Sequence, residues 1–486
     1  MQFHAWSMAG LVVACAAIPA VGFAQDGFGS GHGAEAKNMR LVGASDLQGR
    51  SAFQPVIVKQ GERWIAYVGH HGGSAANPLT GRHEANGTSI VDVTDPGRPA
   101  YLHHLPTDSD AEAGGEGGGA QMVQVCAGKD LPKGDRDRFY MLRTDGRKAH
   151  EMWDVTTPER PVKITNVIGN LRSTHRQAWE CDTGIAYVNS GLPGWEVLRM
   201  TQVFDLSDPA KPTHIRDFAL PGQQPGAPQR ANRRLYDGHG PFSTGLKGNR
   251  LYFGYGNVGN GAFQIVDRDK LLQGPKEPTP ENLLYPQVSF QVTGTMQAVH
   301  AVLPLIGMEL PEFAPDGKGR VRDFLLVLPE AIENECREER QVMLVVDITD
   351  DRNPIGVANF QVPNKEGNFC TRGGRFGPHQ TQENLTPIYH KRIVFVAWFN
   401  AGVRAVDIRD PYNPMEVGYY IPATNRNTQP SCVKTAEGPR CKIAIVTNNV
   451  EVDDRGYIYM TDRAGSGLHI LEPMGEVRKI AGFPRQ

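Results

Sequence analysis

The segment SIVDVTDPGRP, from Ser89 to Pro99, decides the fold because the chain repeats it. A short apolar strand ends in Asp, a turn rich in Thr, Asp and Pro follows, and a second Pro opens the next strand. Asp and Thr accept hydrogen bonds from nearby backbone N–H groups and Pro presets φ, so the segment predicts a tight turn between two strands. The clear copies are EMWDVTTPERP from Glu151, QVFDLSDPAKP from Gln202, MLVVDITDDRNP from Met343 and VRAVDIRDPYNP from Val403, and the degenerate ones are FQIVDRDK from Phe263 and LHILEP from Leu468.

The spacing of these seven copies predicts a β-propeller. The shared acidic position recurs every 51 to 80 residues, at 92, 154, 205, 267, 347, 407 and 472, and each interval has room for four strands, A to D. The Pro that opens strand D cannot donate to a ladder, so D is an edge strand and A lies innermost. A parallel β-solenoid is the rival, but its repeats are shorter. We therefore predict an all-β fold, a seven-bladed propeller of four-stranded antiparallel blades.

The repeat resembles that of the LVIVD-repeat proteins, which are exported bacterial β-propellers. The stretches RLVGASDLQGR from Arg40, RFGPH from Arg375, WFNAGVRAVDIRDPYNPMEVG from Trp398 and GYIYMTD from Gly456 strengthen the resemblance, which covers residues 40–475. It implies the fold and little about chemistry.

The N-terminus predicts export. Residues 1–24 contain no Lys, Arg, Asp or Glu and end in small residues, which is typical of a secretory signal peptide. The alternative is a lipoprotein with Cys15 lipidated. We expect residues 25–39 to be flexible, residues 40–486 to form the propeller, and the protein to be periplasmic or secreted. No later segment is long and apolar enough to span a membrane. The net charge of −2 gives no argument for nucleic acid as a partner.

Six cysteines remain after the signal peptide, and an exported chain favours disulfides. In the predicted topology Cys126 and Cys181 end the A strands of neighbouring blades. Cys336 and Cys370 fall in loops on one face, and Cys432 and Cys441 flank a short connection between blades. We therefore predict the pairs Cys126–Cys181, Cys336–Cys370 and Cys432–Cys441, with other pairings left open.

Four consecutive blades carry a histidine near the start of strand A: His175, His239, His300 and His379. In an antiparallel blade the start of A lies beside the end of B, so these residues should share one face with the ends of the B strands and line the channel. That face should also carry His70, His71, Glu330 and Asn400, and strand alternation would place Glu383 deeper in the channel.

The four histidines predict a metal site on the propeller axis. Imidazole suits Fe, Cu or Zn, and few carboxylates leave positions open for a substrate or O₂. The layout is similar to that of two families of histidine-bearing propellers, the carotenoid oxygenases and the selenium-binding-protein-like thiol oxidases, although their other motifs are absent. Glu383 would then orient a histidine ring. The alternative is a non-catalytic binding or interaction propeller, with the histidines bonded to backbone or water in a wet channel.

Together these features predict an exported, metal-dependent oxidoreductase that acts on a small organic or thiol substrate at the propeller mouth. The chain contains no phosphate loop, so we expect no nucleotide cofactor. Nothing in the sequence indicates an oligomeric state. The long insertion in blade 5, LIGMELPEFAPDGKGRVRD from Leu305, joins A to B and should lie on the opposite face from the histidines, as a partner contact or a decoration.

Overall fold

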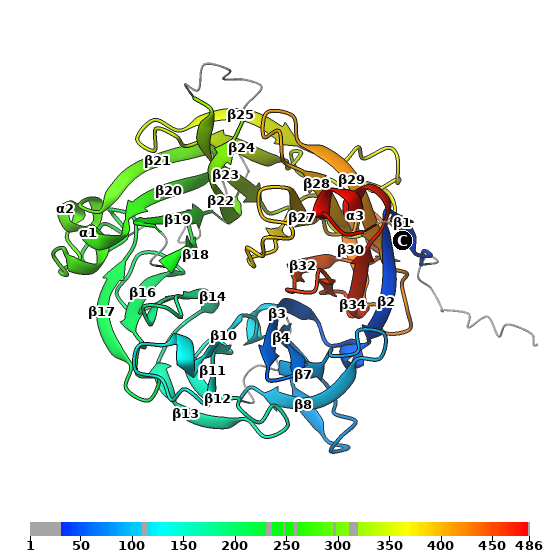
Figure 1. The fold of residues 1–486 in the computed structure, drawn as a ribbon, viewed down its shortest axis with the longest axis horizontal. Coiled ribbons are helices and arrows are strands. Elements are labelled where there is room, and N and C mark those ends of the chain that lie inside the picture. The colour runs from blue at the N-terminus through cyan, green and yellow to red at the C-terminus, as the bar shows by residue number, and fades with distance from the viewer. Residues whose placement is uncertain are drawn as a thin grey trace, which may run out of the picture.

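The computed structural model describes residues 31–108, 115–229, 236–245, 248–256, 260–294, 298–310 and 319–484, with side chains from residue 118 in the second range. The predicted signal peptide, Cys15 and residues 311–318 of the blade 5 insertion lie outside these ranges. Seven antiparallel sheets stand around a common axis, with the A strands innermost (Figure 1). The predicted seven-bladed β-propeller is confirmed.

The strands of the first four blades follow the repeat in chain order. Blade 1 contains β3 (Ala52–Gln60), β4 (Arg63–Gly72), β7 (Gly87–Asp92) and β8 (Ala100–Pro106), with β9 (Gly115–Ala120) paired to β4. Blade 2 contains β10 (Val123–Ala127), β11 (Phe139–Asp145), β12 (Ala149–Asp154) and β13 (Val162–Ile168). Blade 3 contains β14 (Thr174–Trp179), β15 (Ile185–Ser190), β16 (Met200–Asp205) and β17 (Thr213–Phe218). Blade 4 contains β18 (Gly238–Ser243), β19 (Arg250–Tyr255), β20 (Gly261–Asp267) and β21 (Gln287–Gly294).

The last three blades complete the ring. Blade 5 contains β22 (Val299–Glu309), β23 (Val321–Pro329), β24 (Met343–Asp347) and β25 (Ile355–Phe360). Blade 6 contains β26 (Gln380–Thr381), β27 (Ile393–Ala397), β28 (Val403–Asp407) and β29 (Met415–Ile421). Blade 7 contains β32 (Thr447–Val452), β33 (Ile458–Asp462), β34 (Gly467–Pro473) and β2 (Met39–Ser45).

The ring closes through its N-terminus, which the repeat pattern did not predict. Strand β2 runs antiparallel to β34, from Met39 opposite Pro473 to Ser45 opposite Leu468, and so supplies the outer strand of the last blade (Figure 1). Strand β1 (Glu35–Lys37) pairs with the edge of β29. Paired structure therefore begins within the stretch, residues 25–39, that we expected to be flexible. Helix α3 (Gly475–Ala481) packs its buried face on blades 6 and 7.

The repeated aspartate has the expected local role. The side chain of Asp92 accepts a hydrogen bond from the backbone N–H of Thr94 at 2.9 Å, and Asp205 and Asp347 do the same two residues ahead at 2.8 and 2.9 Å. This Asx turn closes the link from C to D. In blade 4 the equivalent Asp267 instead caps helix α1 (Arg268–Gln273), by accepting from Lys270 N–H at 3.0 Å. Helix α2 (Pro280–Leu284) follows, which accounts for the degenerate copy of the repeat.

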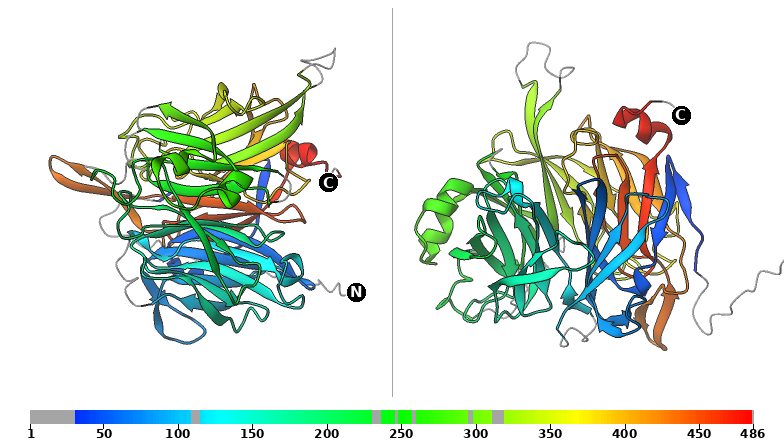
Figure 2. Two further views of the ribbon diagram at one scale, coloured as in Figure 1. Left: turned by 90° about the vertical axis from the view of Figure 1, so that its left-hand side faces the viewer. Right: turned by 60° about the horizontal axis from the view of Figure 1, so that its bottom comes forward.

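Short elements project from the ring in both directions along its axis. The hairpin of β30 (Pro430–Thr435) and β31 (Gly438–Ile443) leaves one face, and the tip of blade 5 leaves the other (Figure 2). A smaller hairpin, β5 (Ser74–Ala76) with β6 (His83–Ala85), belongs to the B–C loop of blade 1. Two 3₁₀ turns, η1 (Leu47–Gly49) and η3 (Gly128–Asp130), lie between strands. None of the described helices is long and apolar enough to cross a membrane.

The cysteines form the three predicted pairs. Cys126–Cys181 joins blades 2 and 3 with a Cα separation of 5.5 Å, and Cys336–Cys370 joins two loops on the histidine face at 5.2 Å. Cys432–Cys441 lies across the β30–β31 hairpin at 4.0 Å.

Candidate metal centre

Irregular pairing between strands A and B positions the axial side chains. The register shifts between Thr174 and Gln177 in blade 3, between Gly238 and Pro241 in blade 4, and between Val299 and Ala301 in blade 5. A bulge of this kind releases a residue from the ladder and re-aims its side chain. His175, His239 and His300 each lie inside one of these bulges, and His379 directly precedes β26. The backbone irregularity therefore re-aims three of the four predicted histidines, His175, His239 and His300.

These four residues, here called the histidine cluster, lie together in the interior. Their exposed fractions are 5% for His175 and 1% for each of the other three. Neighbouring ring centroids are 5.5 Å apart for His175 and His239, 4.9 Å for His239 and His300, and 3.9 Å for His300 and His379.

Ligand atoms converge in two overlapping groups that share His300. One group is His175, His239 and His300, and the other is His300, Glu330 and His379, each with all its ligand atoms within 4.8 Å of one another. Two ligands held about 2.1 Å from one Zn²⁺ ion lie about 3.4 Å apart in a tetrahedral site. Either group could therefore hold an ion after small rotations of its side chains.

Hydrogen bonds to Nδ1 fix which ring nitrogen carries the lone pair. Nδ1 of His239 lies 3.0 Å from the Val299 carbonyl, Nδ1 of His300 lies 3.2 Å from the His379 carbonyl, and Nδ1 of His379 lies 2.7 Å from the Asn448 carbonyl. A backbone carbonyl only accepts, so Nδ1 donates its proton and Nε2 keeps the lone pair that a metal ion needs. Each acceptor lies at or just before the start of strand A in the next blade, so the same contact recurs between successive blades.

His175 reaches back to blade 2 instead. Its Nδ1 lies 2.6 Å from Oε1 of Gln121, whose Nε2 in turn donates to the Gly118 carbonyl at 3.5 Å. That second bond identifies the oxygen as the atom facing the ring, so Nε2 of His175 is also the nitrogen with the lone pair.

Burial disfavours the protonated form of two rings of the cluster. Burial, reinforced by the positive charge of Arg199, holds the pKa of His239 well below its usual value. Burial, followed by repulsion from a charged His379 ring, does the same to the pKa of His300. Both rings are therefore unprotonated at neutral pH, which is the state that binds metal.

Glu330 is the carboxylate that reaches the cluster. Its Oε1 lies 3.9 Å from Nε2 of His379 and accepts a hydrogen bond from Nη1 of Arg375 at 2.8 Å. The Glu330 side chain is 7% exposed, so the arginine offsets the cost of keeping its charge in the interior.

Glu383 contacts the cluster only indirectly in the described contacts. It forms an ion pair with Nη2 of Arg176, whose Nη1 donates to the backbone carbonyl of His300 at 2.9 Å. The orienting role that we predicted for Glu383 is filled by backbone carbonyls and Gln121. The physical reason is that β26 covers only Gln380–Thr381, so strand alternation ends before residue 383.

The other three residues predicted for this face contact Phe53, the blade 1 sheet and a loop of the same face. His71 lies behind Phe53, with ring centroids 5.0 Å apart. Nε2 of His70 is 2.7 Å from Oγ of Ser89, within the blade 1 sheet. Nδ2 of Asn400 donates to the carbonyls of Phe369 and Gly373 at 2.8 and 2.7 Å, so it fixes the loop that carries Cys370.

Two residues at the cluster were not predicted from the sequence. Phe53, 1% exposed, lies edge-on to three rings of the cluster, with centroid distances of 5.5 Å to His175, 5.9 Å to His379 and 6.3 Å to His300. It occupies the axial bulge of blade 1, where the register shifts between Ala52 and Pro55. Arg176 is the other, and the only signal for it was its place beside His175.

Fold and site together define a seven-bladed β-propeller with a buried histidine cluster on its axis. No protein-family model matches the chain, and no curated protein matches it. Among solved structures, Raptor from Chaetomium thermophilum aligns at 12% identity over 92% of this chain, with a TM-score of 0.46. The chain spans 29% of that protein's length, and nothing about function is carried over.

Proposed function

We propose that this protein binds a transition metal ion on the propeller axis and oxidises a small organic or thiol substrate there, in the periplasm or outside the cell. The observation that carries the metal site is the convergence of the ligand atoms of His175, His239 and His300, which all lie within 4.8 Å of one another in the interior. Neutral imidazoles suit Fe, Cu or Zn.

The chain's own residues have distinct roles in this proposal. The Nε2 atoms of His175, His239 and His300 would hold the ion and leave at least one position open. Glu330 would accept a proton released by a bound substrate, because its carboxylate lies beside His379 and is held by Arg375. Phe53 would exclude water from one side. A bound Fe or Cu ion would supply the one-electron and O₂ chemistry that amino acid side chains lack.

The proposed export is supported by the three cysteine pairs at disulfide distance. Such pairs persist in oxidising compartments and are rare in the cytosol. The predicted signal peptide, residues 1–24, lies outside the described residues.

Metal analysis of variants tests the site and distinguishes the two ligand groups. His300→Ala should lose the metal in either case because both groups contain His300. His239→Ala should lose it only if the first group holds the ion, and His379→Ala or Glu330→Gln only if the second group does. The control is His469→Gln, which alters a buried histidine in blade 7 outside both groups. If all four site variants retain the wild-type metal content per chain, the proposal is wrong. Aerobic assays of the metal-loaded protein with thiols and small phenols test the oxidation.

The competing function is a non-catalytic binding propeller, and one observation favours it. The Nδ1 atoms of His239, His300 and His379 each bond to the next blade, so these imidazoles could serve only to hold the blades of the propeller together. In that case His300→Ala lowers stability while wild-type protein carries no stoichiometric metal.

A further inference from the structure

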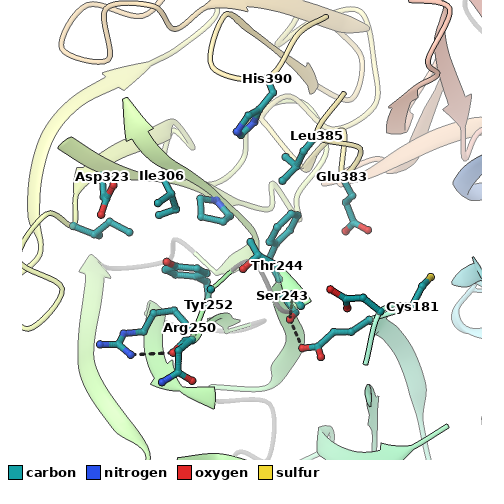
Figure 3. A pocket seen from close by; sticks show the side chains of 18 of the residues that line it. Cys181, Ser243, Thr244, Arg250, Tyr252, Ile306, Asp323, Glu383, Leu385 and His390 are labelled. Atoms are coloured by element: carbon teal, nitrogen blue, oxygen red, sulfur yellow. Dashed lines mark hydrogen bonds between the residues drawn. The ribbon is translucent and has the colours of Figure 1, made fainter. Parts of the chain in front are cut away.

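A large cavity opens on the face opposite the histidines. Its volume is about 750 Å³, and it is lined by turns and strand ends of blades 2 to 6 (Figure 3). That size falls in the range of about 300–1,000 Å³ that is typical of small-molecule sites. Leu385 and His390 of blade 6 lie on one side, and Tyr252 and Arg250 of blade 4 on another.

The described lining of this cavity, here called the acidic cavity, has a net negative charge. It contains one arginine, Arg250, one histidine, His390, and six carboxylates: Asp130, Glu180, Asp182, Asp323, Asp351 and Glu383. Three of these carboxylates are paired with arginines: Asp351 accepts from Arg250 at 2.6 Å, Glu180 pairs with Arg268, and Glu383 pairs with Arg176. The described wall therefore still has three more carboxylates than arginines that pair with them. An anionic ligand would be repelled, and a cation would be attracted.

The carboxylates are spread around the wall. Among the described residues, the groups whose ligand atoms converge closely enough for a metal ion are the two at the histidine cluster, and neither includes a carboxylate of this cavity. A bare metal ion would therefore find no coordination sphere here. A polyatomic cation is long enough to reach carboxylates that lie apart, and it can donate several N–H hydrogen bonds.

Apolar and aromatic side chains complete the lining. Phe242, Tyr252, Ile306 and Leu385 reach the cavity from blades 4, 5 and 6. They offer a surface for a hydrocarbon or ring, and the faces of Phe242 and Tyr252 can attract an ammonium group. The ligand should therefore combine a positive charge with an apolar body.

We propose that the acidic cavity binds a small organic amine, protonated at neutral pH, whose apolar part lies against Phe242, Tyr252 and Leu385. The site lies beyond the histidine cluster, and the proposal does not depend on the metal. Glu383 links the two regions, because it lines the cavity and pairs with Arg176, which donates to the His300 carbonyl.

Calorimetric titration with 2-phenylethylamine tests this proposal, with 2-phenylethanol as a neutral ligand of nearly the same shape. A chelator in the buffer removes metal, so the result is independent of the histidine site. We expect saturable 1:1 binding of the amine, at least about tenfold weaker binding of the alcohol, and weakening of amine binding by added salt. Equal affinity for the two ligands, or no saturable binding of the amine, overturns the proposal.

Two charge-removing variants locate the binding. Asp182→Asn changes an exposed residue and Asp323→Asn a half-buried one at the cavity wall, and each should weaken amine binding at least about fivefold. Asp137→Asn is the matched control, because Asp137 is an exposed residue of the A–B connection in blade 2 outside the cavity. Circular dichroism verifies that each variant is folded. Unchanged affinity in both cavity variants, or an equal loss in the control, refutes the assignment.

Discussion

His469 should make the protein less stable in acid, by an amount that the structure defines. The residue lies on β34 with an exposed fraction of 7%, and burial lowers its pKa from 6.5 to about 4. Between these two values the unfolded chain binds a proton at this site and the folded chain does not, so stability falls as the pH falls below 6.5. Integration between the two pKa values gives a loss of about 2 kcal/mol between pH 8 and pH 5.

The measurement is a comparison with His469→Gln, which keeps a similar volume and cannot titrate. Urea unfolding of both proteins at several pH values gives the free energy of unfolding, and the difference between them cancels all other titrating groups. We expect that difference to shift by about 2 kcal/mol from pH 8 to pH 5 in favour of the variant. The control is His83→Gln on the exposed strand β6. A difference that stays constant with pH to within about 0.5 kcal/mol would refute a buried, neutral His469.

Three further predictions concern other parts of the ring. Burial raises the pKa of Glu451 to about 8, so the folded protein loses stability as the pH rises through that value and the carboxyl ionises. The free energy of unfolding of the wild type should fall by about 1.4 kcal/mol between pH 7 and pH 9 relative to Glu451→Gln. The same pH dependence in both proteins, measured by urea unfolding, would contradict this. Replacing Cys126 and Cys181 together by Ser opens a loop of 55 residues and should lower the free energy of unfolding by about 4 kcal/mol, whereas an unchanged denaturation midpoint would argue against this bridge. Deletion of residues 1–45 removes β2 and exposes the edge of β34, so light scattering should detect aggregation. Deletion of residues 1–33 is the control and should cause none. A monomeric 46–486 chain would disprove closure by β2.

The repeat predicts the fold because one local rule governs every copy. An aspartate that closes the C–D turn and a proline that marks strand D recur often enough to define blades and their inner and outer edges. The same topology places the cysteine pairs and brings His175, His239, His300 and His379 to one face. These predictions need only strand order, which a sequence carries.

What the sequence could not predict depends on backbone and on packing between blades. The partners of Nδ1 are mostly carbonyls, which every residue has, so no side-chain pattern reveals them. Phe53 resembles an ordinary core residue until a bulge turns it toward the axis. Glu383 was expected beside the histidines, but the two-residue β26 ends the alternation on which that expectation rested. The acidic cavity combines turns from blades 2 to 6, a combination that only the closed ring creates.

A crystal structure of the metal-loaded protein, with anomalous diffraction collected at the absorption edge of the bound metal, is the decisive test of the metal site. We expect one strong anomalous peak on the propeller axis, about 2.0–2.2 Å from Nε2 of His300 and from the ligand atoms of the other two residues of one group. An axis without an anomalous peak, with the four Nε2 atoms bonded to separate protein groups or waters, would contradict it.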